Sequence, residues 1–206
     1  MAEASVKKEN AWSMIRLGLI LAAYAVVACA MLAVVNNFTA PKIAQNQEKK
    51  VSAAMKEFFP EDGLTFETIN DFTPPVVGAI TVDEMYVAKR GNEIVGGAAQ
   101  VTGPTYDQGS ILIGIKTDGT VTGLKFLKLT DSPGFGLKAN DSTFTLPNGK
   151  TFYGQFEGKN AKGGFTAGEN FDAISGATIT SVAVSSLINE GTKNILEYFK
   201  LKGVEK

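Results

Sequence analysis

The sequence has no histidine and a single cysteine, Cys29, in 206 residues. Without an imidazole it has no Ser–His or Cys–His catalytic pair, no His-ligated haem and no ordinary zinc site. One thiol provides neither an iron–sulfur cluster nor an internal disulfide. The sequence therefore predicts no catalytic residue and no metal ligand, and any redox chemistry must come from an organic cofactor.

A strong charge of either sign is also missing, because 20 basic side chains balance 21 acidic ones. The formal net charge of -1 gives no uniform field that would attract nucleic acid, so we expect no nucleic-acid partner. The length of 206 residues fits one ordinary domain with an accessory segment.

One long apolar run stands near the N-terminus, LGLILAAYAVVACAMLAVV at residues 17–35. Its roughly 19 uncharged residues nearly span a hydrocarbon layer as a helix, which predicts a transmembrane helix at residues 17–36. The alternative is a cleaved signal peptide, because VVAC at residues 26–29 resembles the cleavage box before a lipidated cysteine. The apolar run continues well beyond Cys29, which favours an uncleaved anchor.

Basic residues flank this run on both sides, so charge alone does not decide its orientation. They are Lys7, Lys8 and Arg16 before the run and Lys42, Lys49 and Lys50 after it. A short N-terminal tail before a single apolar segment usually stays in the cytoplasm, so we expect residues 1–16 to be cytoplasmic. The body, residues 61–206, is then expected on the outer, periplasmic or extracellular side of a bacterial cell membrane.

Small residues recur at three- and four-residue steps along the same run. They are Gly18, Ala22, Ala25, Cys29 and Ala33. Such a stripe favours close contact with a partner membrane subunit, but it also arises simply because alanine is common in transmembrane helices. Both interpretations stay open.

The segment after the apolar run has the signals of a second helix. Thr39 and Pro41 are typical of a helix start, and apolar residues then recur on one face until Pro60. This pattern predicts an amphipathic connecting helix at residues 39–60.

Strand signals follow in two pairs. EMYVAKR and EIVGGAAQVTG flank one turn, and SILIGIKT and TVTGLKFLKLT flank another, which predicts two hairpins. Residues 147–168 are rich in glycine and polar side chains and predict an irregular connection, and helical spacing from Thr180 to Phe199 predicts a C-terminal helix. The predicted class is α+β, an antiparallel sheet with flanking helices.

A cluster of small and hydroxyl residues stands at the start of this helix, in DAISGATIT at residues 172–180. A loop that leads into a helix offers unpaired backbone N–H groups and the positive end of the helix dipole, which favours phosphate binding. The alternative is an ordinary helix cap, because Ser and Thr are preferred at helix starts whether or not a ligand binds. The candidate residues are Ser175, Gly176, Ala177, Thr178, Thr180 and Ser181.

The longer string DxxSGAT resembles the attachment motif of the FMN-binding domain family. Its fixed positions are Asp172, Ser175, Gly176, Ala177 and Thr178. The resemblance implies FMN as the cofactor, joined to Thr178 by a phosphoester, and a flavin transferase that uses FAD as donor and magnesium in its own site. Asp172 either orients the loop for that transferase or is a carboxylate at the helix entry, and both interpretations stay open.

The segment TDSPGFG at residues 130–136 resembles TETPGLG of the same family, which follows the second hairpin and lies against the flavin. The residues expected at the cofactor are Thr130, Ser132, Pro133, Gly134 and Phe135. Phe135, where the family has leucine, either stacks on the flavin ring or packs beside it. The segment also matches G-x-G-x-x-A, but a dinucleotide site is not predicted because no strand-to-helix context is present.

A single membrane helix combined with such a domain resembles the G subunits of Rnf complexes, which are membrane-bound ferredoxin:NAD oxidoreductases that move sodium ions or protons. This resemblance implies an electron carrier whose partners are the other membrane and peripheral subunits. The C subunit of the sodium-translocating NADH:quinone oxidoreductase shares the motif but is typically longer, and it is the second interpretation. A free-standing flavin reductase and a membrane-anchored, non-redox binding or assembly module stay open as well.

Overall fold

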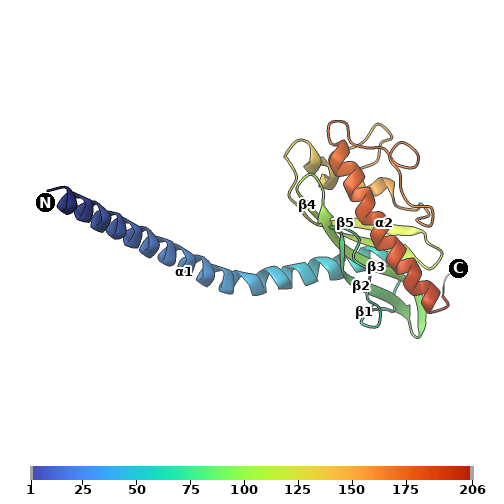
Figure 1. The fold of residues 1–206 in the computed structure, drawn as a ribbon. Helices are drawn as coiled ribbons and strands as arrows, with labels where there is room; N and C mark the ends of the chain where they lie inside the picture. The colour runs from blue at the N-terminus through green and yellow to red at the C-terminus, as the bar shows by residue number, and fades with distance from the viewer. Residues whose placement is uncertain (1, 205–206) are drawn as a thin grey trace. The chain divides into compact units, whose positions relative to one another are not determined.

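A computed structural model describes residues 2–204, drawn as a ribbon in Figure 1. The chain separates into two compact units, Met1–Glu48 and Lys49–Lys206. Helix α1, Ala2–Phe58, makes up the first unit and continues into the second. The second unit adds a β-sheet, a second long helix and an irregular segment.

Helix α1 contains the apolar run. Large side chains such as Leu17, Leu21 and Leu32 are exposed along it. From Trp12 onward the helix is long and apolar enough to cross a membrane, with a mean hydropathy of 2.6 in its most apolar window. A row of exposed apolar side chains is stable in lipid rather than in water, which supports membrane association.

The predicted helix start at Thr39 is wrong, because α1 runs through both Thr39 and Pro41. The Thr39 hydroxyl donates to the Val35 carbonyl, one turn earlier, at 2.8 Å instead of capping a new helix. Pro41 lacks an N–H and so leaves the Asn37 carbonyl without its helical donor, but its fixed φ is compatible with a helix. The pair Thr39 and Pro41 is therefore compatible with a new helix start and with the interior of a continuous helix, and the sequence does not distinguish the two. Helix α1 ends at Phe58, two residues before the predicted bound at Pro60.

The sheet of the second unit has five antiparallel strands in the order β1-β2-β3-β4-β5. The strands are β1 (Leu64–Thr68), β2 (Thr81–Arg90), β3 (Glu93–Pro104), β4 (Gln108–Lys116) and β5 (Val121–Leu129). The turns of the two predicted hairpins contain Gly91 and Gly119, both at positive φ, which suits tight turns. The α+β class and both hairpins are confirmed, whereas β1 was not predicted.

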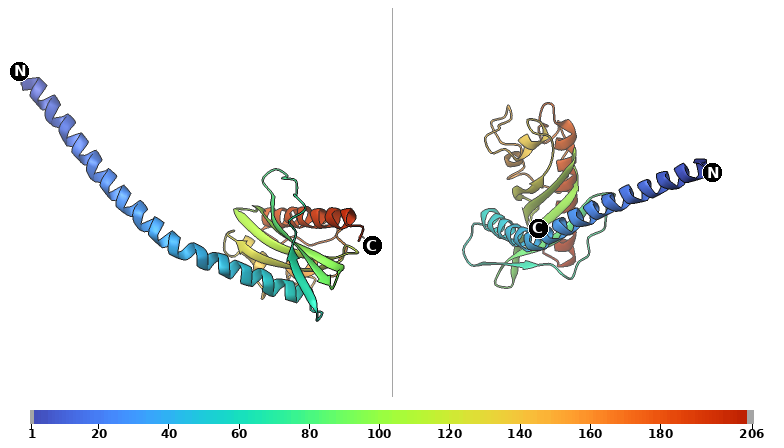
Figure 2. Two further views of the ribbon diagram at one scale, coloured as in Figure 1. Left: turned by 90° about the horizontal axis from the view of Figure 1, so that it is seen from below. Right: turned by 90° about the vertical axis from the view of Figure 1, so that its left-hand side faces the viewer.

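The two faces of the sheet are covered by different helices, α2 (Thr178–Leu201) on one and the last turns of α1 on the other, as Figure 2 shows. Strand β4 alternates accordingly. Ile111 and Ile113 belong to the core under α2, while Leu112 between them packs with Met55 of α1. Successive side chains of a strand point to opposite faces of the sheet, so a strand that is covered on both faces contributes alternate residues to two cores.

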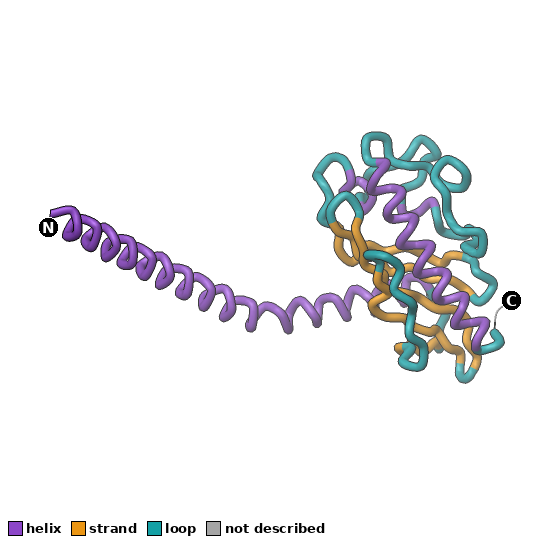
Figure 3. The backbone as a smooth tube through the Cα atoms, in the orientation of Figure 1, coloured by secondary structure: helices purple, strands orange, loops and turns teal. Residues whose placement is uncertain are grey.

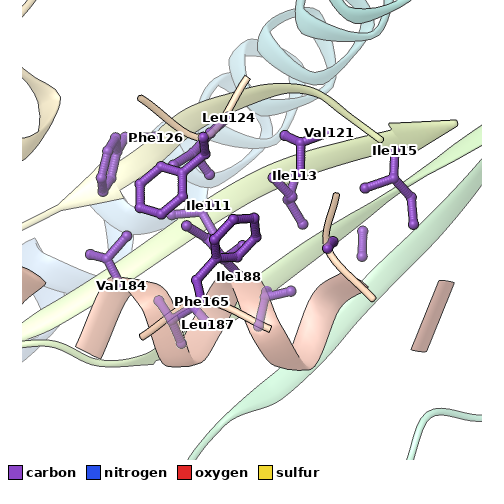
Figure 4. Close-up of a cluster of buried hydrophobic side chains, with 14 of the residues drawn as sticks. Ile111, Ile113, Ile115, Val121, Leu124, Phe126, Phe165, Val184, Leu187 and Ile188 are labelled. Carbon is purple, nitrogen blue, oxygen red and sulfur yellow. The ribbon is translucent and has the colours of Figure 1, made fainter. Parts of the chain in front are cut away.

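The irregular segment between β5 and α2, residues 130–177, is held by buried aromatic rings. Phe156 lies edge-on to Phe165 with the ring centroids 5.1 Å apart and edge-on to Phe152 at 5.6 Å, and Phe171 packs beside it at 5.3 Å. Figure 4 shows Phe165 among side chains of the sheet and α2. Full burial of a phenylalanine side chain stabilises by about 1.5–3 kcal/mol, so these rings fix a segment that has little regular structure.

The helices of this segment are two short turns, η1 (Gly136–Asn140) and η2 (Tyr153–Gln155). Figure 3 shows its loops, in teal, gathered around the beginning of α2. The arrangement places the two motif segments, TDSPGFG and DAISGAT, at the same end of α2.

Candidate cofactor-attachment site

The DAISGAT loop turns directly into α2. The Ala177 N–H donates to the Ile174 carbonyl at 2.9 Å, which closes a tight turn around Ser175 and Gly176. Gly176 has φ +79, a conformation that other residues rarely adopt. Ser175, Gly176 and Thr178 are exposed, so the Thr178 hydroxyl is accessible from solvent.

No side chain caps the start of α2. Its N-cap residue is Ala177, and no side-chain cap hydrogen bond is present there. The first intrahelical bond runs from the Ser181 N–H to the Ala177 carbonyl at 3.0 Å, so the N–H groups of the first turn are the unpaired donors of a helix start. The interpretation of the hydroxyl cluster as an ordinary cap is therefore wrong for this helix.

Two hydroxyls of the cluster are buried and bind within the protein. The Ser181 hydroxyl accepts from the Ile174 N–H at 3.0 Å and donates to the Ala177 carbonyl at 2.9 Å. The Thr180 hydroxyl donates to the carboxylate of Asp131 at 2.5 Å. Ser181 thus bonds to the backbone of the DAISGAT loop, and Thr180 bonds α2 to the TDSPGFG segment.

Asp131 is the polar centre of this region, although it is only 2% exposed. One carboxylate oxygen accepts from the Thr105 hydroxyl at 2.5 Å and the Asp107 N–H at 3.0 Å. The other oxygen accepts from the Thr180 hydroxyl at 2.5 Å and the Tyr106 N–H at 3.3 Å. These bonds join the β3–β4 turn, the TDSPGFG segment and the first turn of α2.

Burial raises the pKa of Asp131, but its hydrogen bonds from the Thr105 and Thr180 hydroxyls and from two backbone N–H groups outweigh burial and hold that pKa below the usual value. The carboxylate is therefore ionised at neutral pH. Four donors satisfy the charge in place of a basic partner.

Gly136 allows the close approach on which this geometry depends. A Cβ at Gly136 would lie 2.6 Å from the Asp131 side chain and 2.6 Å from the Thr180 hydroxyl. The neighbouring Phe135 ring lies over Gly176, because a Cβ at Gly176 would be 3.5 Å from the ring. The two motif segments, more than 30 residues apart by their numbers, are therefore in direct contact.

The remaining predicted residues of TDSPGFG form an exposed turn. The Thr130 hydroxyl donates to the Gln108 carbonyl at 3.1 Å, and the Ser132 carbonyl accepts from the Phe135 N–H at 3.3 Å. Pro133 is exposed, and Gly134 has φ +77.

Asp172 lies at the other end of the attachment loop. Its carboxylate accepts from the Asn148 amide at 2.8 Å, and its backbone exchanges two bonds with the Gln155 side chain at 2.8 and 3.1 Å. Gln155 is almost fully buried, so the backbone of Asp172 is anchored while its carboxylate stays at the surface. The contacts favour a role in ordering the loop.

Large apolar side chains are exposed around the start of α2. They are Tyr106 (66%), Phe135 (58%), Ile179 (63%) and Val182 (45%). A cleft of about 280 Å³ exists elsewhere in the second unit, beside β5 and Tyr153, but none of the predicted site residues lines it. The surface around Thr178 is open.

Comparisons with known proteins agree on both parts of the chain. Residues 2–58 match the model of the RnfG N-terminal region, and residues 106–193 match the FMN-binding domain. The G subunit of the Na(+)-translocating ferredoxin:NAD(+) oxidoreductase complex of Acetobacterium woodii is 32% identical over 206 residues, 91% of this chain and 94% of the relative. The chain belongs to the RnfG family. The G subunits of ion-translocating oxidoreductase complexes from Vibrio vulnificus and Pseudomonas aeruginosa are 27% and 26% identical, over 88% and 91% of this chain and 87% and 89% of the relatives.

Membership of the RnfG family confirms the resemblance found in the sequence. The FMN-binding domain match supports FMN as the cofactor and contains both motif segments. The assignments of individual residues to the flavin, including Thr178, stay predictions.

Sequence reasoning missed the residues that organise the site of this RnfG family member. Asp131, which stands where the related segment TETPGLG has glutamate, was not among the predicted site residues, and neither were Thr105, Asn148 and Gln155. An acid inside a glycine-containing loop was the available signal for Asp131. No local pattern marks the other three, because each acts on a residue at least 17 positions away.

Proposed function

We propose that this chain is an electron-carrier subunit of a membrane-bound, ion-translocating ferredoxin:NAD oxidoreductase. The proposal follows its Acetobacterium relative, which is the G subunit of such a complex. The chain covers nearly all of that relative, and it has both the N-terminal region and the FMN-binding domain of the family. Its partners are then the other membrane and peripheral subunits.

FMN is joined to Thr178 by a phosphoester in this proposal. The supporting observation is that Thr178 combines an exposed hydroxyl with a position in the uncapped first turn of α2. An ester there would bring the phosphate to the unpaired N–H groups and the positive end of the helix dipole. Ser175 and the loop backbone at Gly176 would help to hold the phosphate, and the exposed ring of Phe135 would offer the neighbouring apolar surface.

A covalent bond suits a site this open. Pockets that retain a small molecule without a bond usually bury most of its surface, whereas Ser175, Gly176 and Thr178 are exposed. When bound, FMN supplies the electron chemistry that the side chains of this sequence lack. The protein holds the phosphate end and positions the cofactor, so retention no longer depends on affinity.

Attachment requires a separate flavin transferase, because no imidazole is available to deprotonate the Thr178 hydroxyl. With FAD as donor, the threonine oxygen bonds to the phosphorus of the FMN half. The bond from that phosphorus to the AMP half breaks, AMP leaves, and the hydroxyl proton passes to the transferase.

The membrane topology in this proposal has residues 1–16 in the cytoplasm and residues 17–36 across the membrane. Residues 39–60 connect the anchor to the body, and residues 61–206 carry FMN on the outer side. The exposed apolar surface of α1 supports the anchor.

The attachment is tested by co-expressing the full chain with a flavin transferase and examining the denatured protein by fluorescence on a gel and by mass. We expect wild type and the control Ser186→Ala, which removes an exposed hydroxyl of α2 outside the predicted site, to gain the mass of one FMN less one water. Thr178→Val should gain nothing, while its urea midpoint stays at the wild-type value because the side chain is exposed. Flavin on Thr178→Val would refute the assignment, and an unlabelled wild type would refute the covalent cofactor.

A further inference from the structure

The start of α2 is fixed by a contact from outside the helix. Helix starts are usually held by an N-cap side chain, but here the N-cap residue is Ala177. Instead, the hydroxyl of Thr180, in the first turn, donates to the buried carboxylate of Asp131. Both side chains are only 2% exposed.

The same carboxylate is held from the opposite side by the β3–β4 turn. The Thr105 hydroxyl and the N–H groups of Tyr106 and Asp107 all donate to it. This turn joins the paired strands β3 and β4, so Asp131 connects the sheet to the first turn of α2. Gly136 leaves room for this contact, because a Cβ at that position would lie 2.6 Å from both the Asp131 side chain and the Thr180 hydroxyl.

We propose that Asp131 is a positioning residue for flavin attachment: through Thr180 it sets the place and direction in which Thr178 is presented to the flavin transferase. This inference rests on the proposed attachment at Thr178. Thr178 lies two residues before Thr180 in the same turn, so a tilt or fraying of that turn moves its hydroxyl directly. Small displacements of a reacting atom reduce rates strongly, by up to about a hundredfold for 1 Å.

The alternative explanation is that Asp131 contributes only to global stability. A control variant separates the two. Ile195 is fully buried on the same helix, 17 positions after Thr178, which is about 25 Å along the helix axis. Ile195→Ala is expected to destabilise the body by about 2–5 kcal/mol through loss of packing, without touching the first turn.

The experiment measures the initial rate of flavin attachment to the full chain in detergent, with purified transferase and FAD, at a temperature where every variant is folded. We expect Asp131→Asn and Thr180→Val each to lower kcat/KM for attachment by about tenfold or more. Ile195→Ala should stay within about twofold of wild type, since the first turn is unchanged. The double variant, Asp131→Asn with Thr180→Val, should be no slower than the slower single variant, because both break the same contact.

Attachment to Asp131→Asn at the wild-type rate would overturn the inference, and so would rates that follow stability across all variants, including Ile195→Ala. If the double variant lost a factor in kcat/KM equal to the product of the two single-variant factors, the residues would act independently, which would overturn the inference as well. These results differ from failure of the proposed function, in which wild type itself takes up no flavin or Thr178→Val takes it up normally.

Discussion

Replacement of Asp131 by asparagine is expected to destabilise the Lys49–Lys206 unit by about 2–3 kcal/mol. The amide has nearly the same shape as the carboxylate, so no cavity forms and the effect is confined to hydrogen bonding and charge. One edge of the side chain keeps an oxygen that accepts from Thr105 and Asp107. The other edge has an amide NH2 group in place of the oxygen, and this group faces the Thr180 hydroxyl and the Tyr106 N–H, which are donors as well.

The magnitude follows from these four contacts. A hydrogen bond to a charged group contributes about 1.5–3 kcal/mol and a neutral one about 0.5–1.5, so the two retained bonds lose about 1 kcal/mol each. At the other edge the amide NH2 group cannot accept from the Thr180 hydroxyl, so that bond is lost, whereas the N–H of exposed Tyr106 can find water. This edge therefore adds up to about 1 kcal/mol. A total of about 2–3 kcal/mol is a large part of the about 5–15 kcal/mol that stabilises a typical domain.

The assay is pulse proteolysis of the full chain in detergent across a urea series, which reports unfolding of the body. With an m-value of about 2 kcal/mol per molar, the urea midpoint should fall by about 1–1.5 M. A fall of less than about 0.3 M at pH 7 would contradict the reasoning, because it would mean that the four contacts contribute almost nothing.

The pH dependence gives a second check on the same variant. The folded pKa of Asp131 lies below its unfolded value of about 3.9, so its contribution is fully present above that pH and is lost as pH falls through the folded pKa. The difference between wild type and Asp131→Asn should therefore be constant from about pH 8 to 5 and shrink below about pH 4. An unchanged difference at about pH 3 would show that the charge of Asp131 is not its cause.

Two further predictions concern packing and topology. Gly136→Ala should destabilise the body by about 1–3 kcal/mol in the same assay, since the new Cβ would lie 2.6 Å from Asp131 and Thr180. The control Gly163→Ala should be close to neutral, because no atom lies within 4 Å of its new Cβ. Protease added to right-side-out vesicles should cleave the body, residues 61–206, and complete protection would place the body in the cytoplasm.

Much of the fold could be predicted because its signals are local. Alternating side chains and glycine turns marked the hairpins of β2–β3 and β4–β5, and helical spacing marked α2. Strand β1 has only five residues, LTFET, so its alternation is too short to mark a strand by itself, and it forms because β2 offers it an edge, with Leu64 opposite Arg90. The continuation of α1 through Pro41 was equally invisible, since the same residues are typical of a helix start.

The sequence by itself determined the α+β class, the apolar N-terminal helix and the DxxSGAT string that ends at Thr178, because each depends on residues close together in the chain. Only the tertiary structure decided which hydroxyls of the cluster are exposed and which are bound inside. A hydroxyl bonds to whatever group the fold brings within about 3 Å. For Thr180 that group is Asp131, 49 positions away, which in turn is held from Thr105.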